Sequence, residues 1–246
     1  MRSILLYSLI LLSLFQLYLQ QSSTYKNANL NLWSCTEGRR QSPMDLRSDN
    51  STFTSDFNLV YENYQAFDNV VLTYKDNLLE VSDKQSLLSG SDNKGYLVFD
   101  YRGYLFKYDL EKIVIHLPTE HTIDGEGYDL ELEFYHKKDF TYTSEVNKYQ
   151  KIPDISHYLV ISSMYSLDGT NSDSGFLSNL RRYYHPNGVN ANSIGMNWDI
   201  MESGLIRDKR FYFYSGSDTV YPCSETHLHY VIADIFKIDQ ATLNSY

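Results

Sequence analysis

The fold of this chain is decided by two neighbouring runs of sequence: Lys112-Ile113-Val114-Ile115-His116-Leu117 and, after the turn residues Asp124-Gly125, Leu130-Glu131-Leu132-Glu133-Phe134-Tyr135-His136. Both runs are rich in β-branched and aromatic residues, and the second alternates between apolar and polar positions. These features are typical of strands, and Asp-Gly is a strong turn signal. The two runs therefore predict β-strands over Lys112–Leu117 and Leu130–His136.

The same composition recurs on both sides of these runs. It predicts further strands at Val70–Tyr74, Tyr96–Phe99, Tyr158–Ser162, Arg210–Tyr214 and Tyr230–Ile235, with turns at Ser89–Asp92, Asp124–Gly127 and Ser215–Ser217. One helix is predicted over Asp173–Tyr184, because its apolar residues recur at helical spacing. No repeat or linker interrupts residues 33–246. We therefore expect one mainly β domain with a few short helices.

Composition excludes several classes of protein. The chain has 246 residues, of which 42% are hydrophobic and 15% aromatic, which is too apolar for a disordered chain. Acidic residues number 31 against 21 basic ones, for a formal net charge of −10. Because phosphate binding requires clustered Lys and Arg, this charge argues against nucleic acid as a partner.

The first residues indicate a compartment. Met1-Arg2-Ser3 carries one positive charge, an apolar run follows from Ile4 to Leu19, and polar residues end it. This order is typical of a secretory signal peptide. We assign residues 1–21 to the signal, 22–32 to a short linker and 33–246 to the folded domain. The alternative is an uncleaved membrane anchor, because no Ala-x-Ala-like cleavage site is visible.

A secretory route would account for two further features of the sequence, its pair of cysteines and a glycosylation motif. Cys35 and Cys223 are the two cysteines of the chain, and in an oxidising compartment we expect them to form a disulfide rather than two buried thiols. Asn50-Ser51-Thr52 matches the acceptor motif for N-glycosylation and lies in a polar stretch. We therefore expect a secreted protein with an exposed, glycosylated Asn50.

Three segments together resemble the α-class carbonic anhydrases. They are Arg40–Leu46, Glu120–Gly125 running into Leu130–Leu132, and Tyr214–Thr219 running to Pro222–Glu225. The resemblance extends from about Trp33 to Ile238. It implies a large, twisted, mostly antiparallel central sheet with short peripheral helices. It also implies a disulfide between Cys35 and Cys223, and cis peptide bonds before Pro43 and Pro222.

The zinc site is where this chain departs from the family. Family members hold zinc with three histidines, two of them at i and i+2 on one strand and the third on the neighbouring strand. The resemblance places Val114, His116 and Glu133 at these positions, so His116 alone is retained. Gln65 stands at the position of the proton-shuttle histidine and cannot titrate. Two donors leave a weak, open site, and without the metal no bound water becomes acidic enough to react.

Other positions of the family's site are kept. Thr219 matches the hydroxyl that orients the zinc-bound hydroxide, Glu120 the carboxylate that accepts from that hydroxyl, and Glu131 the partner of the missing histidine. We expect Glu120 and Thr219 to persist as a buried structural hydrogen-bond network, with residual catalysis as the alternative. An unpaired buried carboxylate is costly, so we expect His116 and Glu133 to form a charge-assisted hydrogen bond.

The other histidines have simpler interpretations. The resemblance implies that His121 is buried and hydrogen-bonded, and strand alternation places His136 on the face opposite Glu133. His227 and His229 share a face and resemble a metal-binding pair, although a pair of satisfied strand residues is the simpler alternative. His157 and His185 are expected at the surface or in loops.

The leading functional hypothesis is a secreted, catalytically inactive carbonic-anhydrase-like domain without a cofactor. It would bind a protein partner or another extracellular ligand, with no catalytic residues. The first alternative is an active CO2-hydrating enzyme, with zinc held by His116, Glu133 and a donor not identified. The second is a subunit of a larger complex, membrane-anchored through Ile4–Leu19.

Overall fold

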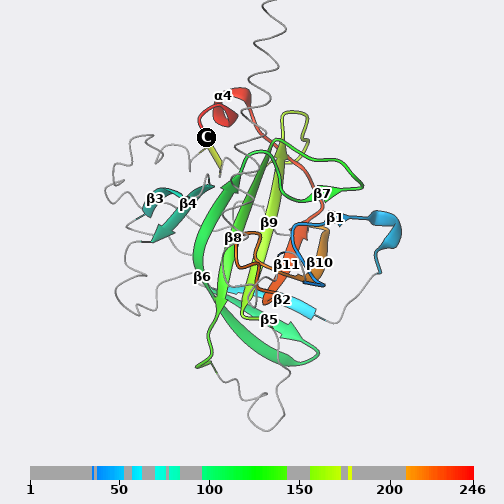
Figure 1. Cartoon of the computed structure of the whole chain (residues 1–246), viewed down its shortest axis with the longest axis vertical. Coiled ribbons are helices and arrows are strands. Elements are labelled where there is room, and N and C mark those ends of the chain that lie inside the picture. Colours follow the sequence, from blue (N-terminus) through cyan, green and yellow to red (C-terminus); the bar gives the residue numbers. More distant parts are fainter. Residues whose placement is uncertain are drawn as a thin grey trace, which may run out of the picture.

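The computed structural model describes residues 35, 38–52, 57–62, 70–75, 78–83, 96–142, 156–172, 177–178 and 209–246. The predicted signal peptide and linker (1–32), Gln65 and His185 lie outside these residues. Within them almost all regular structure is strand (Figure 1). The strands are β1 (Asp45–Leu46), β2 (Phe57–Glu62), β3 (Val70–Lys75), β4 (Leu78–Asp83), β5 (Tyr96–Tyr101), β6 (Tyr104–His116), β7 (Thr122–Ile123), β8 (Leu130–Lys138), β9 (Tyr158–Ser166), β10 (Phe211–Gly216), β11 (His227–Ile232) and β12 (Phe236–Lys237).

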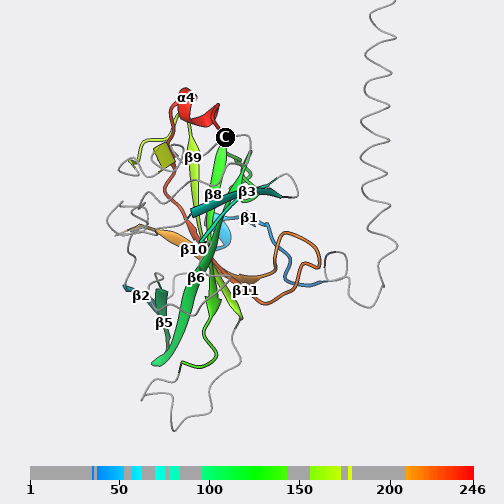
Figure 2. The ribbon, with the colours of Figure 1, turned by 90° about the vertical axis from the view of Figure 1, so that its left-hand side faces the viewer.

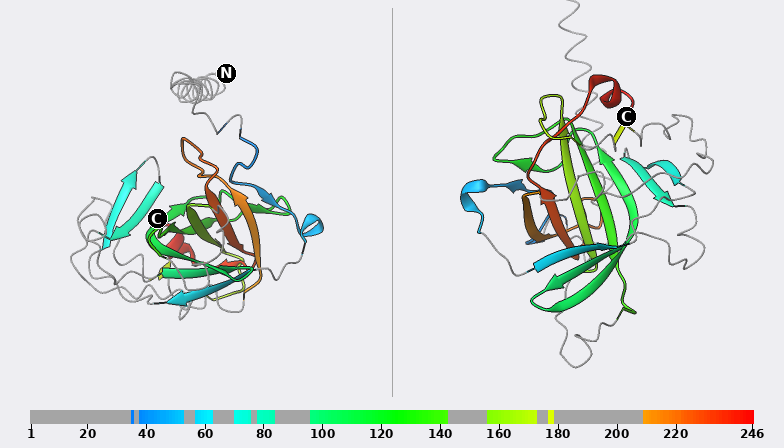
Figure 3. Two further views of the ribbon diagram at one scale, coloured as in Figure 1. Left: turned by 90° about the horizontal axis from the view of Figure 1, so that it is seen from below. Right: turned by 180° about the vertical axis from the view of Figure 1, so that it is seen from behind.

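Ten of these strands form one curled sheet, which Figure 3 shows from below and from behind. Its main path runs β10-β11-β9-β8-β6-β4-β3, while β5 joins β2 to β6 and β12 pairs with β9. The pairings are antiparallel except where β11 and β12 run parallel to β9. β1 and β7 form a separate parallel pair. The predicted mainly β fold with a large, mostly antiparallel sheet is confirmed.

The strands differ from the sequence prediction mainly in their ends. β6 begins at Tyr104, eight residues before the predicted start, because its first half pairs with β5. β11 covers His227–Ile232 rather than Tyr230–Ile235, so both of its histidines lie inside the sheet. β2, β4 and the two-residue strands β1, β7 and β12 were not predicted. The predicted turn at Ser215–Ser217 is wrong for Ser215 and Gly216, which belong to β10.

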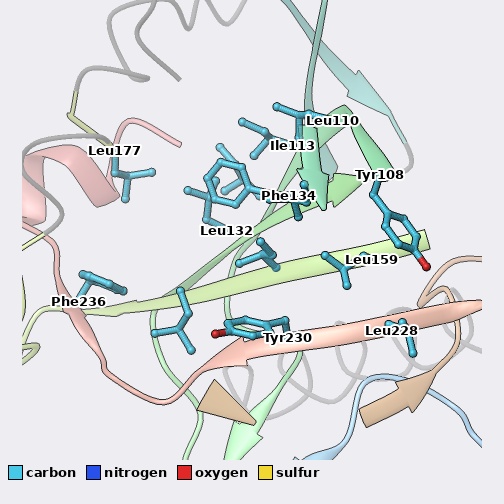
Figure 4. Close-up of a cluster of buried hydrophobic side chains, with 14 of the residues drawn as sticks. Tyr108, Leu110, Ile113, Leu132, Phe134, Leu159, Leu177, Leu228, Tyr230 and Phe236 are labelled. Atoms are coloured by element: carbon cyan, nitrogen blue, oxygen red, sulfur yellow. The ribbon is translucent and has the colours of Figure 1, made fainter. Parts of the chain in front are cut away.

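The main core covers one face of the sheet. Figure 4 shows alternate side chains of β6, β8, β9 and β11 packed together on that face, among them Ile113, Leu132, Leu159 and Leu228. The residues between them point to the opposite face and are also buried on the central strands, as the unbroken burial of β11 shows. The sheet therefore has two buried faces, one apolar and one that carries the predicted site.

Helices contribute little to the described part of the chain. A 3-10 turn covers Ser48–Asn50, and α4 covers Gln240–Leu243, capped by the Asp239 side chain. Of the helix predicted at Asp173–Tyr184, Leu177 and Ser178 are described and helical, and Leu177 packs into the main core. No described helix is long and apolar enough to span a membrane.

The segment before β1 is tied to the loop between β10 and β11, and Figure 2 shows the two side by side. The predicted disulfide between Cys35 and Cys223 is confirmed. The backbone N–H of Arg40 donates to Glu225 Oε1 over 2.7 Å, and its guanidinium lies 3.4 Å from Glu225 Oε2. The peptide bonds before Pro43 and Pro222 are cis, and so is Leu117–Pro118, which was not predicted.

Removing this disulfide should destabilise the protein strongly, because it closes a loop with a sequence separation of 188 residues. We expect the variant with Cys35→Ser and Cys223→Ser to lose roughly 2–5 kcal/mol of unfolding free energy, measured by urea denaturation. Reduced wild-type protein is the matched control and should unfold at the same midpoint as the variant. Equal midpoints for oxidised and reduced wild type would show that the bond does not stabilise the fold.

Candidate functional site

Strands β6 and β8 bring four of the predicted site residues to one face of the sheet. Their antiparallel register sets Val114 opposite Glu133, and His116 opposite Glu131. Because side chains alternate along each strand, all four point away from the main core, to which Leu132 between the two glutamates belongs. The alternation of side chains along each strand and the pairing register of β6 with β8 are therefore enough to bring these four residues together.

His116 and Glu133 form a buried ion pair at the position that the resemblance assigns to zinc. His116 Nε2 lies 3.0 Å from Glu133 Oε2, and the two side chains are 3% and 0% exposed. The other ring nitrogen, Nδ1, lies 3.3 Å from Glu120 Oε1. The hydroxyls of Tyr135 and Ser162 donate to the two oxygens of Glu133 over 3.0 and 3.3 Å. The contact proposed from sequence between His116 and Glu133 is thus present, with both groups held by further partners.

The electrostatics of the pair favour the charged form of both members. Burial disfavours protonation of His116, but the charge of Glu133 and the contacts with Glu120 and Glu133 outweigh it and raise the pKa of His116 to about 10. Burial also disfavours the Glu133 carboxylate, yet the charge and hydrogen bond of His116 hold the pKa of Glu133 well below its usual value. An imidazolium and a carboxylate therefore face each other at neutral pH.

A second histidine–glutamate pair lies beside the first. His121 Nδ1 is 2.5 Å from Glu131 Oε1, and neither side chain is exposed. The backbone N–H groups of Glu120 and His121 both donate to Glu131 Oε2 over 2.9 Å. Burial opposes protonation of His121, but the charge of Glu131 raises its pKa above the usual value. As the resemblance implies, His121 is buried and hydrogen-bonded.

Hydrogen bonds extend from this second pair to the N-terminal segment. His121 Nε2 lies 2.6 Å from the hydroxyl of Tyr214, which donates to Ser42 Oγ over 3.0 Å. His229 Nε2 lies 3.0 Å from the same Ser42 Oγ and 2.9 Å from the carbonyl oxygen of Ser217. Sequence reasoning did not identify Ser42, Tyr214 and Ser217 as part of this hydrogen-bond network. The signal available was that Ser42, Tyr214 and Ser217 lie in the motif segments that carry the family resemblance.

The side chain of Val114 has no atom that could bind a metal ion or accept a proton. Its side chain is 3% exposed and packs with Tyr135 and Val160 in a small apolar cluster on the site face. At the position where the resemblance implies a first histidine ligand, the structure therefore has a packing residue.

These residues do not fit the zinc ion that the resemblance implies. A catalytic zinc site needs three protein donors around one point and an open position for water. Among the described residues, the one group of three His, Cys, Asp or Glu donors within 4.8 Å of one another is His121, Glu131 and Glu133. All three side chains are fully buried and hydrogen-bonded to protein partners. His121 and Glu131 are paired with each other, and Glu133 is held by His116, Tyr135 and Ser162, so none of the three donors is open to a metal.

The expected network between Glu120 and Thr219 is not formed, so that expectation is wrong. Glu120 Oε1 lies against the His116 ring, while Glu120 Oε2 and Thr219 Oγ1 are both buried without a hydrogen-bonding partner in the described part of the chain. The physical reason is electrostatic: the imidazolium of His116 attracts the carboxylate that the family pattern directs to the threonine. Gln65, the expected shuttle position, lies outside the described residues.

His227 and His229 are buried neighbours on β11. Their rings stack 6.0 Å apart, and each has one nitrogen at a backbone carbonyl, Ser224 O over 3.2 Å for His227 and Ser217 O for His229. Burial lowers the pKa of both, that of His229 to about 4. They are therefore neutral rings, each with one nitrogen at a backbone carbonyl, which is close to the simpler of the two interpretations made from sequence, although His229 Nδ1 has no hydrogen-bonding partner in the described part of the chain.

The two remaining described histidines lie away from the site. His136 is fully buried near the carbonyl oxygens of Phe134 and Leu159, and burial lowers its pKa to about 3. His157 is exposed and contacts the ring of Phe140 edge-on.

The ion pair should make stability depend on pH in a defined window. Because folding raises the pKa of His116 from 6.5 to about 10, its contribution is fully present below pH 6.5 and is lost as pH rises through about 10. We predict that the unfolding free energy falls more steeply between pH 6.5 and 10 in wild type than in His116→Gln. The variant should also lose roughly 3–5 kcal/mol at pH 6.5, because Glu133 is left unpaired.

Urea denaturation across this pH range measures both effects. His157→Gln, the same change at an exposed histidine, is the matched control and should keep the wild-type slope. Identical slopes for wild type and His116→Gln would contradict the ion pair.

Comparison with known proteins places the chain in a family. The family model for eukaryotic-type carbonic anhydrase matches residues 23–246. Dioscorin dioA3 of Dioscorea japonica is 27% identical over 198 residues, which cover 78% of this chain and 60% of that protein. Alpha carbonic anhydrase 8 of Arabidopsis thaliana is 27% identical over 202 residues, which cover 82% of this chain and 45% of that protein. The matched region thus spans 60% and 45% of the length of these two relatives, in each case less than two thirds.

Solved structures share the fold. A crystal structure of dioscorin complexed with ascorbate superposes with a TM-score of 0.64 at 24% identity, covering 89% of this chain and 80% of that one. An α-carbonic anhydrase of Thermovibrio ammonificans, solved with the inhibitor sulfanilamide, gives 0.59 at 21% identity, covering 87% and 80%. With the family match extending over residues 23–246, this chain belongs to the eukaryotic-type carbonic anhydrase family.

Proposed function

We propose that this protein is a binding or assembly domain built on the carbonic anhydrase fold, without zinc and without CO2 hydration activity. The observation that carries the proposal is the ion pair between His116 Nε2 and Glu133 Oε2, 3.0 Å apart and buried. This ion pair occupies His116, the one histidine retained at the family's ligand positions. Val114, at a second ligand position, has no atom that could bind a metal.

The chemistry of hydration supports this interpretation. CO2 hydration at neutral pH requires a nucleophilic hydroxide, which a metal provides by lowering the pKa of bound water. At this site the imidazolium of His116 is already neutralised by a carboxylate and screened by burial. It therefore has no uncompensated positive charge with which to stabilise hydroxide. An active enzyme with an altered ligand set would need Glu133 to leave His116 and a third donor to approach.

The relatives support a binding role within the same fold. The dioscorin structure holds ascorbate, so this fold accommodates a small organic molecule in that protein. For the present chain we propose an extracellular small molecule or a protein as partner.

Zinc content and CO2 hydration test this proposal together. Purified wild-type protein should contain far less than one zinc per chain and should not accelerate hydration, and Val114→His alone should behave in the same way. The double variant Val114→His with Glu133→His restores three histidines at the family positions and should gain one zinc per chain. Stoichiometric zinc and inhibitor-sensitive hydration in wild type would overturn the proposal.

We also propose that the protein is secreted and glycosylated. Its disulfide is typical of an oxidising compartment. Asn50, Ser51 and Thr52 are exposed at the end of the 3-10 turn, as an acceptor for an oligosaccharide must be. A membrane-anchored subunit is the alternative, with residues 4–19 retained.

Expression through a eukaryotic secretory pathway tests both points. The medium should contain a protein whose mass falls on treatment with an N-glycosidase, and Asn50→Gln should lack that shift. N-terminal sequencing should give a mature chain that begins near Ser22. Retention in the membrane fraction with an intact N-terminus would establish the anchored alternative instead.

A further inference from the structure

Two buried histidines of β11 hold the loop between β10 and β11, which comprises Ser217–Thr226. His227 Nδ1 lies 3.2 Å from the carbonyl oxygen of Ser224, and His229 Nε2 lies 2.9 Å from that of Ser217. Because a carbonyl oxygen can only accept, each ring donates one N–H to the loop. Both ends of the β10–β11 loop are therefore docked on side chains that can titrate.

A second proton on these rings is poorly accommodated in the docked arrangement. Since His229 Nε2 already carries a proton, the next one must go to Nδ1, which is buried without a hydrogen-bonding partner among the described residues. A buried N–H without an acceptor costs free energy, because the same group is hydrogen-bonded in water. The rings of His227 and His229 also lie 6.0 Å apart, so two positive charges there would repel each other.

The groups around His229 keep it neutral. Burial has the largest effect and lowers its pKa to about 4, and the positive charges of His121 and His227 act in the same direction. The His121 ring lies 5.5 Å away, and the Tyr214 ring stacks on His229 at 4.8 Å. The charge of Glu133 favours a proton on His229, but burial outweighs it.

His227 is kept neutral in the same way. The titratable groups that act on it through ring contact or charge are Tyr135, Tyr158, Lys112, Glu133 and Asp218. Burial has the largest effect and lowers the pKa of His227, and the charge of Lys112 adds to it. The charges of Asp218 and Glu133 oppose this effect without overcoming it.

The other described histidines respond differently to acid. His116 and His121 lie against carboxylates, which raise the pKa of both, so both rings are protonated in mild acid and keep their partners. His136 is buried near carbonyl oxygens of strand residues rather than of the β10–β11 loop. His157 is exposed. The response of the loop to acid therefore depends on the two histidines of β11.

The loop also has two attachments that mild acid leaves intact. Cys223 is bonded to Cys35. The Glu225 carboxylate accepts from the backbone N–H of Arg40 and from the side chain of Gln41, and these hydrogen bonds lower the pKa of Glu225 to about 2. The loop can therefore leave β11 and return to it without losing its connection to the N-terminal segment.

We propose that the β10–β11 loop is an acid-operated cover over the β11 part of the site face, docked while His227 and His229 are neutral and open once they are protonated. In the open loop each ring is hydrated and can hold its second proton. The inference goes beyond the proposed function, because it concerns how this part of the site face is uncovered and not what binds there.

Amide hydrogen exchange of the full chain tests the proposal, with rates corrected for the intrinsic effect of pH. A histidine with a pKa of about 4 when docked and 6.5 when open should raise the open fraction roughly twentyfold between pH 7 and pH 5. The amides of Ser217 and Asp218, which are hydrogen-bonded to Ser42 Oγ and Ser224 O, should lose protection by that factor. The amide of Ile161 in β9 should not.

Two outcomes would overturn the proposal. Unchanged protection of Ser217 and Asp218 at pH 5 would show that the loop stays docked. An equal loss of protection at Ile161 would show that acid unfolds the whole sheet rather than opening the loop.

A variant that cannot titrate makes the test specific. His227→Asn places an amide N–H near the position of Nδ1, and His229→Gln places one near that of Nε2, so the double variant can keep both contacts with the loop. It should retain at pH 5 the protection that it has at pH 7. His157→Gln, the matched control, should show the full wild-type response.

A double variant that opens at pH 5 as wild type does would contradict the role of the two histidines. Near-ultraviolet circular dichroism at pH 7 checks that it folds. If it does not fold, the wild-type exchange profile decides the question alone.

Discussion

The structure depends on one constraint: the carboxylate of Glu133 is buried at the centre of the site face and must be compensated there. His116 supplies that compensation over 3.0 Å, with Tyr135 and Ser162 satisfying the remaining lone pairs. Isolated buried charges are expensive, and removing one member of such a pair costs several times more than the pair contributes. The burial of His116 therefore requires Glu133 as its partner, and the burial of Glu133 requires His116. In a three-histidine site the compensating charge is that of a metal, whereas here it is a proton on His116.

A positive charge on the His116 ring explains the arrangement of the neighbouring residues. A cation fixed on the His116 ring draws Glu120 toward itself, and Thr219 consequently loses the partner implied by the family pattern. Val114, which has no ligand to hold, packs with Tyr135 and Val160. The second pair, His121 with Glu131, keeps the hydrogen bonds that connect the sheet to Ser42 and the N-terminal segment. The residues that the family pattern assigns to a metal site therefore surround an internal salt bridge in this structure.

Much of this could be predicted from sequence, for physical reasons. Alternation along Leu130–His136 places Glu131 and Glu133 on one face and Leu132 on the other, because strand geometry is local. The contact between His116 and Glu133 follows from the cost of an unpaired buried charge. Contacts such as Ser42 with His229, 187 residues apart, have no local signal and depend on the tertiary fold. The orientation of Glu120 was mispredicted because the carboxylate turns toward the nearest cation. The family pattern assumes that this cation is a metal, whereas in this structure it is the protonated ring of His116.

The most direct test of the central claim, that a proton on His116 replaces the metal, is an NMR titration of the His116 ring in the native protein. The account predicts that both ring nitrogens stay protonated from pH 6 to beyond pH 9, and that neither a chelator nor added zinc changes their shifts. A His116 ring that titrates near its ordinary pKa of 6.5, or that loses its Nε2 proton when one equivalent of zinc is added, would contradict it.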